Sequence, residues 1–338
     1  MPDIKENNNR IAYIDFIKVI GIAAIILAHV NPPNILFTIR SFDVPLMVII
    51  SSLLAKKSYQ KFDKSGRFPG LYIWERIKRL VIPTWIFLII YFAVELLLTK
   101  MFREWSYYAY SFGLTMYGIG YVWVILIYIY SALLVPMFYK IKPGIVSSIV
   151  IALIYIIYEV AYYNRLGTDN RAILTTIYYI IPYGVITYLG FNYTSFSKLT
   201  KRIIMIVSFA LFLGMGIYYR YIYGYFHTTQ IAKYPPRIYF IGFGVGVSFL
   251  LLGLCERFSL KLYELKIVKF ISKNSLWIFL WHILVLQLYA VLRLPEKWYV
   301  KYLIVFAAAL LITFVVESVK HLCVKLSKTL KEEKSNIG

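Results

Sequence analysis

The chain has 338 residues, of which 60% are hydrophobic and only 16% are charged, and its mean hydropathy is +0.69. A soluble protein of this length needs far more polar surface, so these values exclude a soluble globular domain and indicate an integral membrane protein. The formal net charge is +21, but most lysines and arginines lie at alternate ends of the apolar segments, which argues against nucleic acid as a partner. The two cysteines are too few for a disulfide framework or a four-ligand metal site.

Apolar segments long enough for membrane helices recur along the whole chain. A helix that crosses the bilayer core needs about 20 apolar residues. The sequence predicts ten such helices, near residues 11–30, 42–55, 80–99, 119–139, 144–163, 172–191, 202–222, 237–255, 268–291 and 301–322. The second is short, and prolines punctuate several of the connections. We therefore expect an all-α, polytopic membrane fold in a single transmembrane domain that covers residues 1–338.

The distribution of basic residues predicts an orientation. The first ten residues have mixed charge, and no cleavage site ends the apolar run behind them, so we predict a retained first helix. Residues 1–10, 56–79, 140–143, 192–202, 256–269 and 323–338 carry 23 Lys and Arg; the loops 31–41, 100–118, 164–171, 220–237 and 292–300 carry 10. The positive-inside rule places both termini in the cytoplasm. We expect a multi-pass protein of a cell membrane, such as a bacterial plasma membrane, with the basic loop 56–79 against anionic lipid headgroups.

Three ionisable residues interrupt the first predicted helix, RIAYIDFIKVIGIAAIILAHV. At 100° per residue, Asp15, Lys18 and His29 fall on one narrow face, and Lys18 and His29 are roughly 16 Å apart along the axis. Ionisable groups within a membrane usually face a protein interior or a water-filled cavity and mark a functional site. The alternative is that Lys18 reaches the headgroups with Asp15 as its partner while His29 lies at the outer interface.

The same stretch resembles the first-helix signature of the membrane-bound acyltransferase family 3, in which Arg is followed by ten residues and then His. Here Lys18 stands in place of the Arg, which keeps the charge but loses the bidentate fork. Further similar stretches are FDVPLMVIISSLL, with Ser51-Ser52 for the usual Ser-Gly, WERIKRLVIPTW, with Arg76 and Arg79, GYVWVILIYIYSALLVP, with Trp123, KYPPRIYF, and SKNSLWIFLWH, with Ser275 and His282.

This resemblance implies transfer of an acyl group, commonly acetyl, from cytoplasmic coenzyme A to a glycan. Acyl-CoA would be a substrate, so no permanently bound cofactor is expected; the acceptor would be a surface polysaccharide or its lipid-linked precursor. Arg76 and Arg79, three residues apart, and Lys18 can form a cationic site for the donor's phosphates, although anchoring to headgroups is the competing interpretation for the arginines. His29 would act as the general base, or as a nucleophile that carries the acyl group.

A base often has a carboxylate that orients it, and three are expected near the outer side. Asp43 follows His29 after a short loop and ranks first. Glu95 ranks second, because helix lengths place it at a depth comparable with that of His29, and Glu159 is the third candidate.

The remaining histidines differ in expected position. Ser275 and His282 share a face of the ninth predicted helix and can line an acyl tunnel or an acceptor groove, or form a structural hydrogen-bonded pair. We expect His227 in a solvated loop and His321 near a solvated helix end.

Two functions of other classes compete with the enzyme. One is a polysaccharide exporter, which should show repeat symmetry and broken helices at corresponding places. The other is a structural subunit of a glycan-synthesis complex, which has no need of Asp15, Lys18 and His29 on one face.

Overall fold

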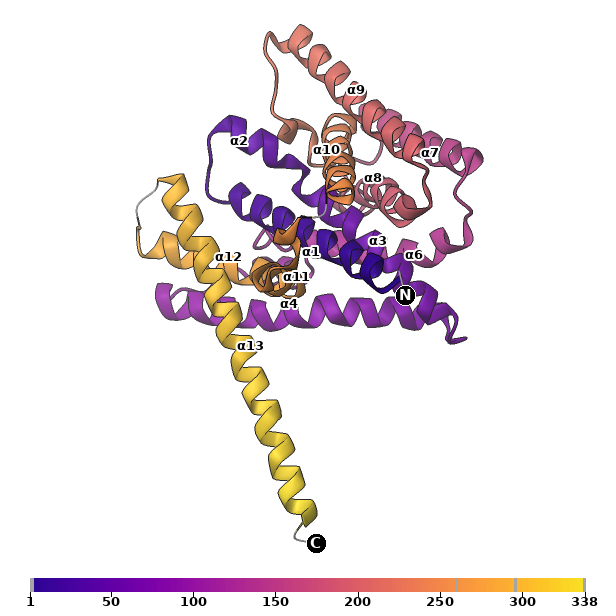
Figure 1. The fold of residues 1–338 in the computed structure, drawn as a ribbon. Coiled ribbons are helices and arrows are strands. Elements are labelled where there is room, and N and C mark those ends of the chain that lie inside the picture. The colour runs from indigo at the N-terminus through magenta and orange to yellow at the C-terminus, as the bar shows by residue number, and fades with distance from the viewer. Residues whose placement is uncertain (1–2, 259, 295–296, 337–338) are drawn as a thin grey trace.

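The computed structural model describes residues 3–258, 260–294 and 297–336 and shows an all-helical architecture (Figure 1). These ranges contain no β-strand, only an isolated bridge between Lys233 and Pro236. The α-helices are α1 (Asp3–Ala28), α2 (Asn34–Ile39), α3 (Asp43–Asp63), α4 (Pro69–Thr99), α5 (Trp105–Phe112), α6 (Trp123–Lys140), α7 (Ile145–Tyr163), α8 (Arg171–Asn192), α9 (Lys198–Tyr223), α10 (Ile238–Arg257), α11 (Lys266–Lys273), α12 (Ser275–Val291) and α13 (Trp298–Asn336). Short 3-10 helices are η1 (Arg40–Phe42), η2 (Tyr193–Ser195), η3 (Thr229–Ala232) and η4 (Lys261–Glu264).

The prediction of an all-α polytopic membrane protein is confirmed. Within the described residues, eight helices are long and apolar enough to cross a membrane, and a ninth span results if α11 and α12 are counted together. These correspond to nine of the ten predicted segments. The first predicted segment, 11–30, coincides with the C-terminal part of α1. The side chains at the N-terminal end of α1 are outside the part of the chain that the structure describes.

Several helices run past the boundaries that hydropathy suggested. α3 continues to Asp63 and α4 already begins at Pro69, because backbone hydrogen bonding does not stop where the apolar stretch stops. The predicted segment 268–291 is not one straight helix but two, α11 and α12, which meet at 78°. The break falls at Asn274, whose φ of −105° and ψ of 18° depart from helical values.

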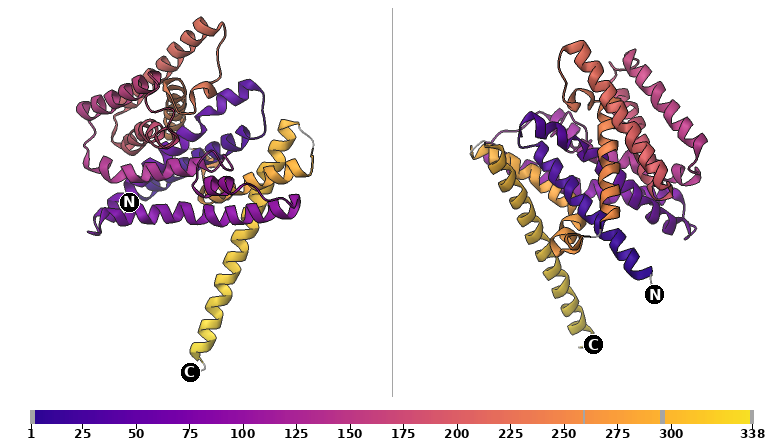
Figure 2. Two further views of the ribbon diagram at one scale, coloured as in Figure 1. Left: turned by 180° about the vertical axis from the view of Figure 1, so that it is seen from behind. Right: turned by 45° about the horizontal axis from the view of Figure 1, so that its top comes forward.

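The helices form a buried centre and an apolar exterior. α1, α3, α10 and α12 supply most of the large core cluster, whereas α4, α7, α9 and α13 carry most of the exposed Leu, Ile, Val and Phe side chains. In a membrane protein such exposed apolar surface faces lipid. The C-terminal part of α13 extends well beyond the other helices in every view (Figures 1 and 2).

A small residue sets how closely two of the central helices approach. A Cβ added to Gly190 of α8 would lie 2.5 Å from the backbone oxygen of Ile49 in α3, closer than real Cβ contacts come. Membrane helices use glycine in this way to bring their backbones together. The packing of α3 against α8 therefore depends on the missing side chain at this position.

Candidate active site

A cavity of about 220 Å³ opens between α1, α3, α4, α6 and α12. Its polar lining includes five residues that the sequence singled out: Lys18 from α1, Ser51 and Ser52 from α3, Arg76 from α4 and Ser275 from α12. Ile25 also lines it, about two turns beyond Lys18 on α1. Phe279 lines it about one turn beyond Ser275 on α12. We call it the inner cavity. It has cations on one part of its wall and mostly apolar side chains elsewhere.

A second hollow of about 340 Å³ adjoins the inner cavity, because Tyr72 and Arg76 line both. Its other basic residues are Lys61, Arg67 and Arg79, from the α3–α4 connection and its flanks. We call it the basic recess. Arg76 thus joins the two hollows, with Lys18 in one and Arg79 in the other, so the three predicted cations gather in one region without lining a single pocket.

Two of these cations have neighbours that fix them. Nε of Arg76 donates to the hydroxyl oxygen of Tyr72 at 3.2 Å. Lys18 lies within electrostatic reach of both Asp15 and Arg76. Asp15 in turn accepts a hydrogen bond of 2.5 Å from the hydroxyl of Ser272, which ties α1 to α11. Asp15 therefore offsets the charge of Lys18 and also links two helices.

Beyond the inner cavity, two histidines from opposite ends of the chain are in contact. Nδ1 of His29 lies 3.0 Å from Nε2 of His282, and the two rings stack with their centroids 5.2 Å apart. His282 is fully buried on α12, and His29 follows the last residue of α1. The ring of Tyr121 packs edge-on against that of His29, with 4.6 Å between the ring centroids. We call His29 and His282 the histidine pair.

The hydrogen bonds of His282 determine which nitrogen of His29 is free. Nδ1 of His282 is bonded to the carbonyl oxygen of Phe279, and a carbonyl can only accept, so this nitrogen carries the proton. In a neutral imidazole the other nitrogen is then an acceptor. Nδ1 of His29 must therefore donate to Nε2 of His282. The lone pair of His29 is left on its own Nε2, which is the form that a base or nucleophile needs.

The histidine pair lies directly beyond the inner cavity. Ile25 precedes His29 by four residues and Phe279 precedes His282 by three, so each is about one helical turn away. The ring of Phe279 also contacts that of His282, with 5.2 Å between centroids. The cavity wall at Ile25 and Phe279 therefore lies about one helical turn from the two imidazoles. The hydrogen-bonded pair of Ser275 and His282 is not formed, since His282 uses its nitrogens for His29 and Phe279.

All three candidate carboxylates are bound to arginines, and two of them, Asp43 and Glu159, also accept a backbone N–H. Asp43 accepts from Nη1 of Arg40 and from the backbone nitrogen of Val44, both at 2.8 Å, so it satisfies an N–H in the first turn of α3 and forms a buried ion pair. Glu159 pairs with Arg237 at 3.5 Å and accepts from the backbone nitrogen of Ile238 at 2.6 Å. The group on the ring of His29 is thus a second imidazole, where sequence reasoning expected a carboxylate.

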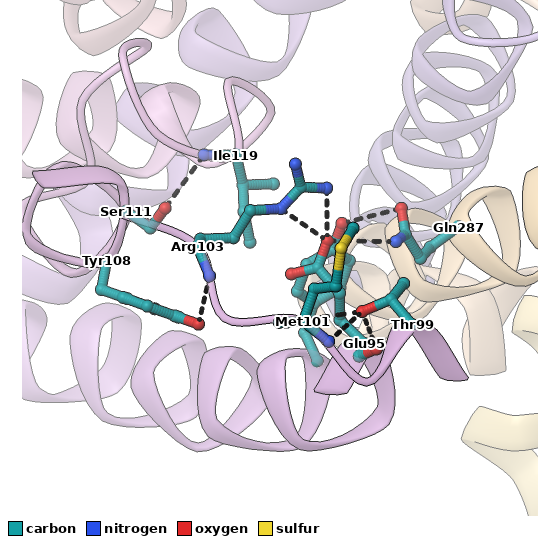
Figure 3. A network of polar contacts seen from close by, with 9 residues as sticks. Glu95, Thr99, Met101, Arg103, Tyr108, Ser111, Ile119 and Gln287 are labelled. Atoms are coloured by element: carbon teal, nitrogen blue, oxygen red, sulfur yellow. Dashed lines mark hydrogen bonds and ion pairs between the residues drawn. The ribbon is translucent and has the colours of Figure 1, made fainter. Parts of the chain in front are cut away.

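The third carboxylate, Glu95, belongs to a network that joins α4 to α12 (Figure 3). Its Oε1 accepts from Nη2 of Arg103 at 2.8 Å and from Nε2 of Gln287 at 3.3 Å. Tyr91 donates to the side-chain oxygen of Gln287 at 3.0 Å. The bond to Glu95 raises the pKa of Arg103, which lies in the loop after α4. Glu95 therefore holds the helix that carries His282, and acts on the histidine pair only through that helix.

The start of α6 and the segment between η3 and α10 contribute aromatic and basic residues that the sequence placed only in general terms. Trp123 is buried among aromatic rings and lies 5.4 Å from Tyr234 between centroids. The ammonium of Lys233 lies 5.9 Å from the Trp123 ring and is close enough to His29 for its charge to act there. Arg40 also lies within electrostatic reach of His29. The position of Arg40 three residues before Asp43 was the feature of the sequence from which their ion pair could have been predicted.

The other two histidines lie apart from the pair. His321 is exposed on α13, as expected. His227 was expected in solvent, but it is half-buried, because the rings of Tyr223 and Tyr225 pack on it with centroids 4.7 and 4.4 Å away. An aromatic-rich loop can enclose its own histidine in this way.

Comparison with known protein families gives a match over most of the chain. A family model described as an acyltransferase domain matches residues 11–318. This range includes the inner cavity, the basic recess and both members of the histidine pair. No curated protein and no solved structure matches the chain.

Proposed function

The chain belongs to the acyltransferase domain family whose model it matches over residues 11–318, and we propose that it is a transmembrane O-acyltransferase of surface glycans. In this proposal it moves an acyl group, expected to be acetyl, from coenzyme A to a hydroxyl of a surface polysaccharide or its lipid-linked precursor. The observation that carries the proposal is a cavity lined by Lys18 and Arg76 at one part and by Ile25 and Phe279, about one helical turn from the histidine pair, at another.

The basic recess and the inner cavity suit the two ends of an acyl-CoA. Phosphates are bound best by charge-assisted hydrogen bonds, and Arg76 and Arg79 offer guanidinium forks for them. Lys18 adds a point charge at the transition to the apolar walls. The extended thiol arm would occupy the inner cavity, with the thioester beneath the histidine pair. The topology predicted from the basic loops puts this entrance on the cytoplasmic side, where coenzyme A is found, with both termini on the same side of the cell membrane.

The chemistry needs one nitrogen to handle a proton. The acceptor's hydroxyl oxygen attacks the thioester carbonyl carbon while its proton passes to Nε2 of His29. The carbon–sulfur bond then breaks, and the departing thiolate of coenzyme A takes this proton from Nε2 of His29. Alternatively, the same nitrogen attacks the thioester, the carbon–sulfur bond breaks, coenzyme A leaves as its thiolate, and His29 carries the acyl group as an acyl-imidazolium. The acceptor's hydroxyl oxygen then attacks the acyl carbon, the carbon–nitrogen bond breaks, and the hydroxyl proton goes to the thiolate. Both routes require Nε2 of His29 to be unprotonated, and its bond to His282 favours that form.

His282 is the residue that this arrangement assigns to orienting His29. A hydrogen bond from Nδ1 fixes both the tautomer and the direction of the ring, the role that Asp43 was expected to fill. His282 does not need to touch the substrate. We therefore regard it as a positioning residue.

The proposal is tested by the surface glycan of cells that carry or lack the protein. Ester-linked acyl groups should be present with the wild-type protein and absent with His29→Ala at equal membrane levels, while the amount of glycan at the surface stays the same. Retained acylation in His29→Ala, or no acylation with the wild type, would reject the enzyme. Glycan that accumulates inside cells lacking the protein would favour the export function.

A further inference from the structure

Lys233 is a buried cation that lacks an anionic partner. Its side chain and backbone together are only 5% exposed. Its ammonium lies 5.3 to 5.9 Å from the ring centroids of Trp123, Tyr234 and Phe240, and it makes no ion pair with any residue that the structure describes. Aromatic faces stabilise a cation only in part, and an uncompensated buried charge is costly. An anionic ligand would supply the missing counter-charge.

The three carboxylates considered as partners of His29 have cationic partners of their own. Asp43 is bound to Arg40 at 2.8 Å, and Glu159 to Arg237 at 3.5 Å. Glu95 is bound to Arg103 at 2.8 Å. Each carboxylate thus already has its own guanidinium, whereas Lys233 has aromatic rings. The excess positive charge at this place favours a ligand that brings a negative charge with it.

The position of Lys233 relative to His29 indicates whether the acyl donor or the acceptor brings the negative charge. Its charge reaches His29, which follows the C-terminal end of α1 about three turns beyond Lys18, near which the donor would enter. The acceptor must reach His29 from the side that the donor does not occupy. Tyr234, which shares a contact with both Lys233 and Trp123, is 49% exposed, so the aromatic wall is open to an approaching molecule. Aromatic faces of this kind also pack on sugar rings.

We propose that Lys233 binds an anionic group of the acceptor glycan, a sugar carboxylate or a phosphate ester, while Trp123 and Tyr234 hold the sugar ring that carries it. This inference rests on the proposed acyltransferase function and adds the substrate class. Lys233 thereby determines specificity: it selects acidic acceptors over neutral ones. A hydrogen bond between the buried ammonium and an anionic group of the glycan should raise the affinity for the glycan about tenfold to a hundredfold.

The experiment uses the protein's own acceptor. Glycan is extracted from cells that lack the protein, and three forms are prepared: untreated, carboxyl-reduced, and freed of phosphate esters. Purified protein in lipid nanodiscs transfers labelled acetyl from acetyl-CoA to each form, and KM for the glycan is measured. We expect one of the two treatments to raise KM about tenfold or more, and the treatment that does so identifies the anion. Equal KM for all three forms, or a glycan without acidic groups, would overturn the proposal.

Variants test whether Lys233 is the residue responsible. Lys233→Met should bring the KM values for untreated and neutralised glycan together, and Lys233→Arg should keep them apart. Arg220→Met removes an exposed cation from the end of α9 and serves as the matched control, with the preference unchanged. A uniform loss of kcat in Lys233→Met for every form, with the preference intact, would reject a specificity role. If the wild-type protein transfers no acyl group to any form, the proposed function fails first.

Discussion

Nδ1 of His29 and Nε2 of His282, 253 positions apart in the chain, lie 3.0 Å from each other. The carbonyl of Phe279 fixes the proton on the far nitrogen of His282, so the bond between the rings has a direction. That direction leaves Nε2 of His29 available for chemistry. The pairing assigns to an imidazole the task that a carboxylate performs in many catalytic sites.

His282→Gln and His282→Ala should differ in a way that a purely structural role does not predict. The alanine variant loses the acceptor for His29 Nδ1, and we expect kcat to fall about a hundredfold, because the wrong tautomer is no longer excluded. The amide oxygen of glutamine can accept the same bond and should restore part of kcat. KM for acyl-CoA should change little in both variants, since His282 is outside the inner cavity. Steady-state kinetics of purified protein would show this, and equal losses in both variants would contradict the positioning role.

The basic residues should act on donor affinity. Lys18→Gln and Arg76→Gln each remove a charge-assisted contact from the hollows, and we expect KM for acetyl-CoA to rise about tenfold to a hundredfold with a smaller effect on kcat. Lys18→Arg should keep the low KM. Lys57, exposed on α3 and outside both hollows, provides the matched control as Lys57→Gln. Unchanged KM in both Lys18→Gln and Arg76→Gln would place the donor elsewhere.

Phe279 should limit the length of the acyl chain. Its ring lines the inner cavity and contacts His282, so it closes the space where the acyl group would end. Phe279→Ala opens that space, and we expect the ratio of butyryl to acetyl transfer to rise about tenfold, the scale on which apolar pockets discriminate methylene groups. Competition between the two donors measures the ratio directly. Phe279→Leu should give an intermediate value, and an unchanged ratio in Phe279→Ala would mean that the acyl chain lies elsewhere.

Gly190→Ala should weaken the fold without touching the site. The added Cβ would meet the backbone oxygen of Ile49 at 2.5 Å, so α3 and α8 must separate. Such overpacking costs about 1–3 kcal/mol. A lower melting temperature in detergent would record it. Gly214→Ala, where an added Cβ meets nothing within 4 Å, is the control and should leave stability unchanged or raise it. Equal melting temperatures for Gly190→Ala and wild type would refute the close approach.

Hydropathy and helix periodicity predicted much of this molecule because both depend on local sequence. The apolar stretches marked all eight spans found among the described residues and the ninth that α11 and α12 form together. The predicted polar face of α1 contributes Lys18 to the wall of the inner cavity and brings His29 into contact with His282. Helix lengths were underestimated, since amphipathic turns such as the end of α3 lie outside an apolar window. The bend at Asn274 has no hydropathy signal at all.

The pairings within the site were less predictable. Asp43 was favoured as the partner of His29 because it follows His29 closely in the chain. Arg40 is closer to Asp43 in the chain than His29 is, and residues three apart on a helix can pair, so Asp43 binds Arg40 instead. His282 and His29 meet because α1 packs on α12, a tertiary fact that no local pattern records. The buried state of Lys233 likewise depends on the surroundings that Trp123 and Phe240 provide from two other helices.

The central claim is that Nε2 of His29 carries out acyl transfer, and purified protein in nanodiscs tests it most directly. Transfer of labelled acetyl from acetyl-CoA to extracted glycan is measured in a single turnover for wild type and His29→Ala, with equal melting temperatures as the control for folding. Loss of a proton-transfer group predicts a rate about 100 to 10,000 times lower in His29→Ala, with acetyl-CoA binding retained. A rate for His29→Ala within a few-fold of wild type would contradict the account.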